Sequence, residues 1–240
     1  MAQIADVNTI FGFWPRREID ISIERLKALM ERHGVAKAVT ISTSAIFYDY
    51  RRGNDETLSA CESDGRLVPA ASLDPREYLH CAEEAERMLS RGVKFFRLFP
   101  DLQGWPFDFR PFHEMLEALS GRGAVVLVPV QGYGRATELA RAVGDRDLKV
   151  VMLGVSYFNL GEVISVAKGD PRFYVETRLI DSAAGLEVAA EALGPERLLL
   201  GTEMPLSYPA PAIEVVRGSN LPEEAKGKIL GGNLLGLLGG

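Results

Sequence analysis

Histidine is scarce in this sequence, which has only three among 240 residues: His33, His80 and His113. All three fall in segments whose apolar spacing predicts helices, and none lies at the end of a predicted strand. A catalytic zinc ion is usually held by imidazoles that converge from fixed elements. The sequence therefore argues against a zinc centre built on histidine.

Cysteine is equally sparse. Cys61 and Cys81 make no CxxC pair and lie in predicted helices, so we expect buried free thiols, with a disulfide as the open alternative. The sequence also lacks a GxSxG elbow, a P-loop and a GxGxxG turn. Its glycine-rich segment, residues 231–240, follows a predicted helix and not a strand, which is the wrong setting for phosphate binding.

No basic tract stands out among the 27 Lys and Arg and the 33 Asp and Glu, which give a net charge of −6. We therefore expect no nucleic-acid partner. The longest apolar runs, such as residues 124–130, are too short to span a bilayer, so we expect no membrane partner. The first ten residues lack the basic start and apolar core of a secretory signal. These absences predict a soluble, cytoplasmic protein.

Apolar runs rich in β-branched residues alternate with helical patterns along the whole chain. The composition, 47% hydrophobic and 25% charged, is that of a globular protein. The expected strands span residues 4–11, 36–42, 66–74, 93–100, 124–131, 148–154, 172–178 and 197–205. The expected helices span residues 19–34, 54–63, 75–92, 108–123, 134–145, 159–170, 182–194, 210–219 and 222–238.

Eight strand–helix units in tandem predict an α/β fold in which helices cover a parallel sheet. A single-domain (β/α)₈ TIM barrel over residues 1–240 fits this length best, and an open doubly wound sheet is the alternative. Active sites of this barrel lie at the carboxyl ends of the strands and in the loops that follow. The candidate segments are therefore 8–14, 42–50, 97–107, 129–134, 154–159, 176–178 and 201–208.

Charged side chains end several of the expected strands. A carboxylate such as Glu203 at the end of an apolar strand is costly unless it is paired or functional. Two interpretations have equal weight: Glu203 and Arg97 form a fixed ion pair, or Glu203 is a general base and Arg97 anchors a substrate carboxylate. Glu176 and Arg178 share one side of a strand. The pair would either face the mouth of the barrel or cap the next helix, with capping as the favoured interpretation, and Arg178 is also a candidate substrate contact.

Aromatic residues concentrate just after the strand ends. Packing of the loops onto the barrel explains most of them, and a few would line an apolar-walled pocket or form the surface of a homodimer. The candidates for contact with a small-molecule substrate or ligand are Trp14, Tyr48, Trp105 and Tyr133.

Three stretches together resemble the amidohydrolase superfamily, in the branch of TIM-barrel metal-dependent hydrolases that includes decarboxylases and lactonases. IADVNTIFG (4–12) is similar to the opening strand, in which an Asp is followed by His-x-His. LLLGTEMP (198–205) is similar to the eighth-strand motif Gly-Thr/Ser-Asp-x-Pro, and ILGGNLLGLLG (229–239) to the closing helix. The segment GVKFFRLFPDLQGWPFD (92–108) also resembles the fourth strand and its loop.

The chain departs from this family at the metal ligands. Asn8 and Ile10 stand at the two first-strand histidine positions. The later histidine positions hold Pro129, or Gln131 by a shifted match, and Gly154, while Glu203 replaces the aspartate. Asp6 matches a family position, but Asp6 and Glu203 alone are few ligands for a hard ion. We therefore expect no metal and no cofactor.

The resemblance also implies that an enzyme can remain without the metal, because some lactone hydrolases of this branch are thought to work without one. We expect a metal-independent hydrolase, or a lyase or lactonase, of a small carboxylate-bearing ring. Glu203 would be the base, and Asn8 and Gln131 would donate hydrogen bonds to an oxyanion. The alternatives are a catalytically inactive ligand- or partner-binding barrel that has lost its metal site, and a metalloenzyme with an unfamiliar ligand set.

Overall fold

Eight parallel strands follow one another around a single sheet in the computed structural model, which describes residues 3–15 and 17–239. They are β1 (Ile4–Phe11), β2 (Val35–Ser42), β3 (Leu67–Ala71), β4 (Phe95–Arg97), β5 (Val125–Pro129), β6 (Lys149–Leu153), β7 (Phe173–Glu176) and β8 (Leu198–Leu199). The Val7 N–H donates to the Leu200 carbonyl at 2.9 Å, and a parallel bridge joins Thr9 to Met204, so the two edges of the sheet meet. The predicted single-domain (β/α)₈ barrel is confirmed.

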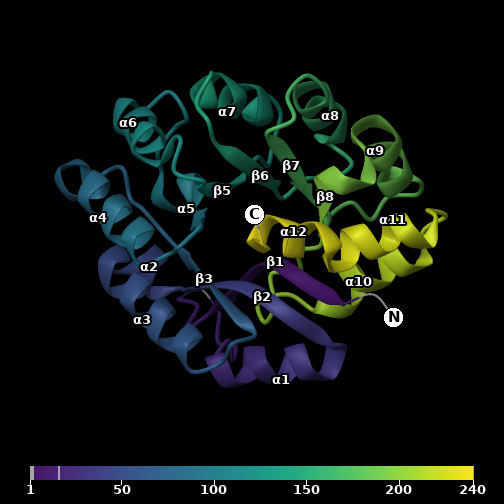
Figure 1. Ribbon diagram of the computed structural model, residues 1–240, viewed down its shortest axis with the longest axis horizontal. Coiled ribbons are helices and arrows are strands. Elements are labelled where there is room, and N and C mark those ends of the chain that lie inside the picture. The colour runs from purple at the N-terminus through teal and green to yellow at the C-terminus, as the bar shows by residue number, and fades with distance from the viewer. Residues whose placement is uncertain (1–2, 16, 240) are drawn as a thin grey trace.

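The helices form a ring around this barrel (Figure 1). They are α1 (Ile23–His33), α2 (Ser44–Phe47), α3 (Tyr50–Glu62), α4 (Tyr78–Ser90), α5 (Pro100–Gln103), α6 (Arg110–Leu119), α7 (Arg135–Val143), α8 (Leu160–Lys168), α9 (Gly185–Leu193), η1 (Pro195–Arg197), α10 (Pro209–Gly218), α11 (Glu223–Gly227), η2 (Lys228–Gly232) and α12 (Asn233–Gly239). None of those in residues 3–15 and 17–239 has the length and apolar character that crossing a membrane requires.

Two helices begin later than apolar spacing predicted, because local hydrogen bonds fix where each helix starts. α1 begins at Ile23 and not at residue 19, because the Ser22 hydroxyl accepts a hydrogen bond from the Arg25 N–H, and it ends at Gly34 (φ 67°) as expected. α4 begins at Tyr78 and not at Pro75, since residues 74–77 form a turn. The one-turn helices α2 and α5 were not predicted, because four residues are too few to show a helical period.

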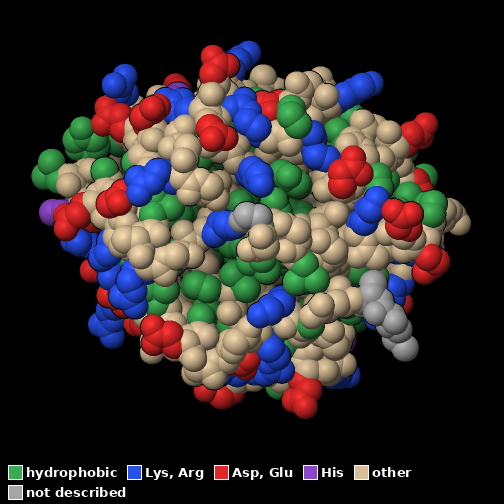
Figure 2. Space-filling model, viewed as in Figure 1, with side chains coloured by type: hydrophobic (Ala, Val, Ile, Leu, Met, Phe, Trp, Pro, Cys, Tyr) green, Lys and Arg blue, Asp and Glu red, His purple; other side chains and the backbone are tan. Residues whose placement is uncertain are grey.

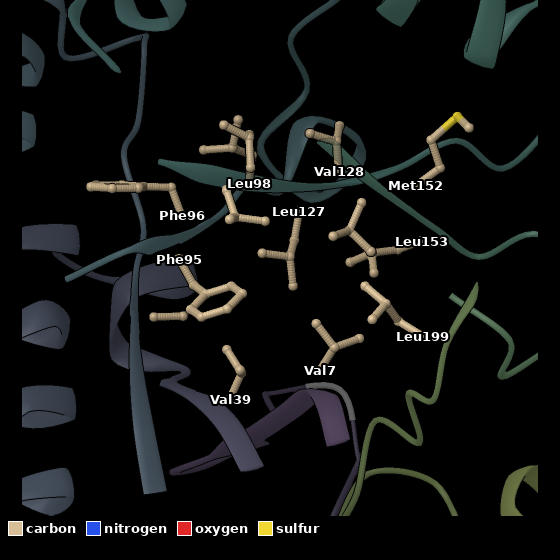
Figure 3. Close-up of a cluster of buried hydrophobic side chains, with 14 of the residues drawn as sticks. Val7, Val39, Phe95, Phe96, Leu98, Leu127, Val128, Met152, Leu153 and Leu199 are labelled. Carbon is tan, nitrogen blue, oxygen red and sulfur yellow. The ribbon is translucent and has the colours of Figure 1, made fainter. Parts of the chain in front are cut away.

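Alternate residues of the strands fill the barrel and face the helices. Figure 3 shows Val7, Phe95, Leu127 and Leu199 pointing towards one another inside the barrel. These four side chains are all fully buried. Phe96, the neighbour of Phe95, points away towards the helices, as the two-residue period of a strand requires.

The C-terminal segment closes the amino end of the barrel. The η2 helix passes so close to β1 that a Cβ atom on Gly231 would lie 2.1 Å from the Gln3 carbonyl oxygen, so only glycine fits there. The Asn233 amide donates to the carbonyls of Pro195 (2.8 Å) and Leu198 (2.7 Å). In Figure 1 helix α12 crosses the middle of the ring. In the same view, Lys and Arg side chains are interspersed with Asp and Glu around the rim (Figure 2).

Strand β1 contains a bulge just before its carboxyl end. Asp6 pairs with Ala38 of β2, but Thr9 pairs with Thr40, so three steps along β1 oppose two along β2. A bulge bends a strand and redirects its side chains. Here it brings Asn8 to the cavity at the mouth of the barrel, one residue after Val7, which fills the interior.

The remaining sequence expectations concern histidine and cysteine. The three histidines lie on α1, α4 and α6, as predicted. Cys61 on α3 and Cys81 on α4 are both free thiols, so the disulfide alternative is wrong for this structure. Cys81 is buried as expected, whereas Cys61 is only half-buried.

Candidate active site

A cavity of about 280 Å³ opens at the carboxyl ends of the strands, where the barrel fold predicts a site. Arg97, Pro129 and Leu153, each the last residue of its strand, belong to its wall. The complete lining is Asn8, Ile10, Trp14, Ile46, Arg97, Phe99, Asp101, Leu102, Pro129, Gln131, Leu153, Gly154, Arg178, Glu203 and Leu206. Apolar walls with a few convergent polar groups are typical of small-molecule sites.

One carboxylate lies between two guanidinium groups in this cavity. The Glu203 Oε1 atom lies 3.3 Å from Nη2 of Arg97, and its Oε2 atom lies 3.1 Å from Nη1 of Arg178. The three residues come from the ends of β4, β7 and β8, which parallel pairing brings to one edge of the barrel. The ion pair that the sequence suggested between Glu203 and Arg97 therefore exists, and Arg178 is part of it.

Arg97 is the most buried member of this group, with 7% of its side chain exposed. Its guanidinium lies 5.0 Å from the centre of the Phe99 ring, and Nη1 donates to the Thr9 carbonyl at 3.4 Å. Its Nε atom has no hydrogen-bond partner among the described residues. Burial lowers the pKa of Arg97, while Glu203 and Glu176 oppose this shift by favouring the charged form.

Glu176 is a buried carboxylate beside the site, and the favoured expectation that it caps the next helix is wrong, because its oxygens accept hydrogen bonds from two other strand ends. The Asn8 side-chain amide donates to its Oε1 atom at 2.7 Å, and the Gly154 N–H donates to its Oε2 atom at 3.1 Å. Gly201 leaves room for it, because a Cβ atom there would lie 2.4 Å from Oε1. Burial raises the pKa of Glu176. Like Glu203, Glu176 is a carboxylate at the end of an apolar strand, where burial is costly unless the group is paired or functional.

A second buried carboxylate, Asp6, lies beneath the cavity. Its oxygens accept hydrogen bonds from the backbone N–H groups of Asn8 (2.9 Å) and Thr202 (3.1 Å) and from the Thr202 hydroxyl (2.5 Å). Desolvation is the largest influence and raises the pKa of Asp6 to about 7, against the lowering effect of those hydrogen bonds. Through its hydrogen bonds with Thr202, Asp6 connects β1 to the segment after β8.

The backbone at Glu203 adopts an unusual conformation. Its φ angle is +58°, and within residues 3–15 and 17–239 only one other non-glycine residue, Ala184, has a positive φ. The Glu203 N–H donates to the Asn8 carbonyl at 2.7 Å, which holds this conformation. Left-handed backbone at a non-glycine residue costs on the order of 1–3 kcal/mol and concentrates at functional sites.

The predicted catalytic residues all line the cavity, in different settings. Glu203 and Asn8 lie as described above, whereas Gln131 is exposed at the rim. One hydrogen bond of the Asn8 amide nitrogen already goes to Glu176, and its Oδ1 atom is buried without a partner in the described part of the chain. The donor role expected for Asn8 is therefore limited to the remaining N–H of its amide.

The predicted substrate contacts divide into two groups. Arg97, Arg178 and Trp14 line the cavity, and the Trp14 ring packs edge-on against Phe47 at 5.1 Å. The other three, Tyr48, Trp105 and Tyr133, are not among the lining residues. Trp105 is 4% exposed and packs against Phe107 and Phe112, whereas Tyr48 and Tyr133 are 75% and 80% exposed. Their contact with a ligand stays a prediction.

The donor atoms at the mouth do not fit a divalent metal ion on the plan of the family that the sequence resembles. No three His, Cys, Asp or Glu side chains of residues 3–15 and 17–239 come together as metal ligands. Ile10, Pro129 and Gly154 offer no side-chain ligand where that plan has histidine. The two guanidiniums beside Glu203 would also repel a dication and already occupy both oxygens of this carboxylate.

A family model described as Amidohydrolase matches residues 11–239. The chain belongs to the Amidohydrolase family. The match begins one residue after Ile10. It therefore leaves out Asn8 and Ile10, which stand where the family's first strand has two histidines. A comparison with curated protein sequences found no match.

Several solved structures share this fold over nearly the whole of both chains. A 2,6-dihydroxybenzoate decarboxylase from Rhizobium has a TM-score of 0.79 at 14% identity, with 100% of both chains covered. A 5-carboxyvanillate decarboxylase from Sphingomonas paucimobilis has a TM-score of 0.75 at 18% identity, with 99% of both covered. A probable 2-pyrone-4,6-dicarboxylic acid hydrolase from Acinetobacter baumannii has a TM-score of 0.74 at 14% identity, covering 99% of this Amidohydrolase family member and 100% of that chain. At these identities the likeness shows the fold.

Proposed function

We propose that this protein is a hydrolase of a small carboxylate-bearing ring, acting without a metal ion. One observation carries the proposal: two guanidiniums from different strands flank a single carboxylate in an apolar-walled cavity at the mouth of the barrel. Guanidinium groups bind carboxylates by paired, charge-assisted hydrogen bonds. The site therefore combines an anchor for an acid with a group that can exchange a proton.

Binding would use the two kinds of surface that the cavity offers. Arg97 and Arg178 bind the acid group, and the side chains of Trp14, Phe99 and Ile46 contact the ring. The volume of about 280 Å³ is near the lower end of the range for small-molecule sites, which favours a single ring over a larger substrate.

Glu203 is the proposed general base. It takes a proton from water, the hydroxide oxygen bonds to the carbonyl carbon of a ring ester, and the ring C–O bond breaks as the protonated Glu203 returns the proton to the leaving alkoxide. The product is a ring-opened hydroxy acid. The free N–H of Asn8 and the rim amide of Gln131 would stabilise the negative charge on the carbonyl oxygen.

The solved structures support this substrate class by analogy alone. Two of them are named as decarboxylases of carboxylated aromatic rings and one as a probable hydrolase of a pyrone dicarboxylic acid. A lyase would use the same anchor, with Glu203 supplying the proton that replaces the departing carboxyl group. Fold-level likeness raises the plausibility of such substrates without assigning one.

A second function, a ligand-binding barrel without catalysis, is favoured by one specific observation. Both Glu203 oxygens already contact guanidiniums. An oxygen that points at a guanidinium is not directed at a water molecule in the cavity, so this arrangement suits an ion pair better than proton transfer. The two functions therefore differ in turnover and not in the ligand that they accept.

The test uses the three compounds named above, 2,6-dihydroxybenzoate, 5-carboxyvanillate and 2-pyrone-4,6-dicarboxylate, in a turnover assay by absorbance and a binding assay by calorimetry. For any compound that turns over, we expect Glu203→Gln to lower kcat by about 10²-fold or more, as loss of a general base does. Glu86→Gln, which removes a carboxylate from an exposed ion pair with Arg122, is the control and should keep full activity. Unchanged turnover in Glu203→Gln refutes the role of Glu203, and binding without turnover supports the second function.

A further inference from the structure

We propose that Glu203 is a resident carboxylate which the acid group of an entering ligand displaces from Arg97 and Arg178. This inference rests on the proposed function, because it concerns the same anchor, but it predicts an exchange of partners within that anchor. The ligand class is a planar carboxylate on a small ring.

The geometry of the three residues is that of an occupied anion site. Each Glu203 oxygen faces a different guanidinium, at 3.3 Å and 3.1 Å. The two oxygens of a ligand carboxylate can take the same two contacts, since carboxylates are alike in shape and charge. Among residues 3–15 and 17–239, the one other carboxylate partner of these arginines is Glu176, whose Oε1 atom lies 3.7 Å from Nε of Arg178.

Glu203 is the most exposed member of the group. Its side chain is 21% exposed, against 17% for Arg178 and 7% for Arg97, and Arg97 is also held by the Thr9 carbonyl and the Phe99 ring. An arginine that turned away from the cavity would remain buried as an unpaired charge, which is costly. A carboxylate that turns towards the open mouth reaches water. Exchange at the anchor therefore moves Glu203 and leaves the guanidiniums in place.

Other charges around the anchor stay in place during this exchange. Glu176 on β7 is bound to Asn8 and Gly154, and Asp6 on β1 is bound to Thr202. Asp101 on α5 also lines the cavity, but it pairs with Arg135 on α7 at 3.1 Å. Within the described part of the chain, Glu203 alone has both oxygens on the two guanidiniums that the ligand would use.

The exchange would also make Glu203 available for base catalysis. While the site holds no ligand, both oxygens of Glu203 contact guanidiniums. Once a ligand acid takes those contacts, Glu203 is released beside the bound ring, where its oxygens can reach a water molecule. Base catalysis would then be available only with a ligand in the anchor.

The experiment measures the affinity of benzoate, with the neutral analogue benzamide as the matched probe, by isothermal titration calorimetry on the full chain. In Glu203→Gln the competing charge is gone, and we expect benzoate to bind at least about tenfold more tightly than to the unaltered protein, with benzamide unchanged. Asp101→Asn removes one negative charge from the same cavity without freeing Arg97 or Arg178, and we expect a change in benzoate affinity of less than about threefold. Glu203→Gly, which suits the positive φ, is the second variant and should behave as Glu203→Gln does.

The exchange is overturned if benzoate binds to both Glu203 variants no more tightly than to the unaltered protein. It is also overturned if the Glu203 variants gain as much affinity for benzamide as for benzoate, or if Asp101→Asn gains as much affinity for benzoate as they do. The absence of benzoate binding to all of these proteins would also overturn it. Failure of the proposed function looks different, because it shows as turnover that survives Glu203→Gln. If benzoate does not bind more tightly to the Glu203 variants but these variants still lose turnover, the exchange is rejected. The role of Glu203 as general base is then retained.

Discussion

The side-chain amide of Asn8 donates a 2.7 Å hydrogen bond to Glu176, across 168 residues of sequence. The other oxygen of Glu176 accepts from the Gly154 N–H. Asn8 and Gly154 stand where the family resemblance has histidines, so one buried carboxylate joins two positions that lack them. Glu176 on β7 therefore joins the end of β1 and the residue after β6 in one hydrogen-bond network.

Removal of the Glu176 carboxylate should therefore destabilise the barrel. Glu176→Ala leaves the Asn8 amide and the Gly154 N–H without their acceptor and removes a charge partner from Arg178, so we expect a loss of about 3 kcal/mol in the free energy of unfolding. Urea unfolding followed by circular dichroism measures it. The exposed control Glu86→Gln should unfold at the same urea concentration as the unaltered protein, and equal behaviour of the two variants would contradict the prediction.

Gly201 should be intolerant of even a methyl group. A Cβ atom there would lie 2.4 Å from Oε1 of Glu176, so Gly201→Ala must push the carboxylate from its donors, and we expect a loss of about 1–3 kcal/mol. Gly161 in α8 has open space at its Cβ position, and Gly161→Ala should stabilise the protein by up to about 1 kcal/mol because alanine favours a helix. The prediction fails if both substitutions shift the unfolding midpoint in the same direction.

Asp6 should make the protein less stable as pH rises. Its pKa is raised from 3.8 to about 7 in the folded state, so between these pH values the folded chain binds more protons than the unfolded chain. Stability then falls with increasing pH across this window, by at most ~1.4 kcal/mol per pH unit. We expect the unaltered protein to lose stability relative to Asp6→Asn between pH 5 and pH 8 in urea unfolding. A difference between the two proteins that is constant over this range would show that Asp6 does not titrate there.

Chelation should leave the protein unchanged. Because the donor set at the mouth does not fit a divalent ion, dialysis against EDTA should alter neither the melting temperature nor the turnover of any substrate found, and addition of Mn²⁺ or Zn²⁺ should not raise either. Elemental analysis of protein purified without added metal gives an independent readout. A stoichiometric ion that resists dialysis would support the metalloenzyme alternative and contradict the proposed chemistry.

Much of the site could be located from the sequence, because a parallel barrel places its strand ends together. Arg97, Glu203 and Asn8 could be named from their positions after apolar runs, and all three line the cavity. The sequence could not show that Trp14 lines the cavity and Trp105 does not. Both follow strands, but one packs into a buried aromatic cluster and the other lines the cavity, which depends on the path of each loop.

The sequence by itself determined the eight strand–helix units and the scarcity of imidazoles, because periodicity, turn residues and composition are local properties of the chain. It favoured a barrel over an open sheet, and the contacts of β1 with the segment after β8 decided between them. The tertiary structure alone decided which carboxylate meets which guanidinium. The bulge in β1, the missing Cβ of Gly201 and the left-handed backbone of Glu203 bring β1, β7 and β8 into one network. Such contacts depend on distances of a few tenths of an ångström between residues far apart in sequence, and no local pattern records them.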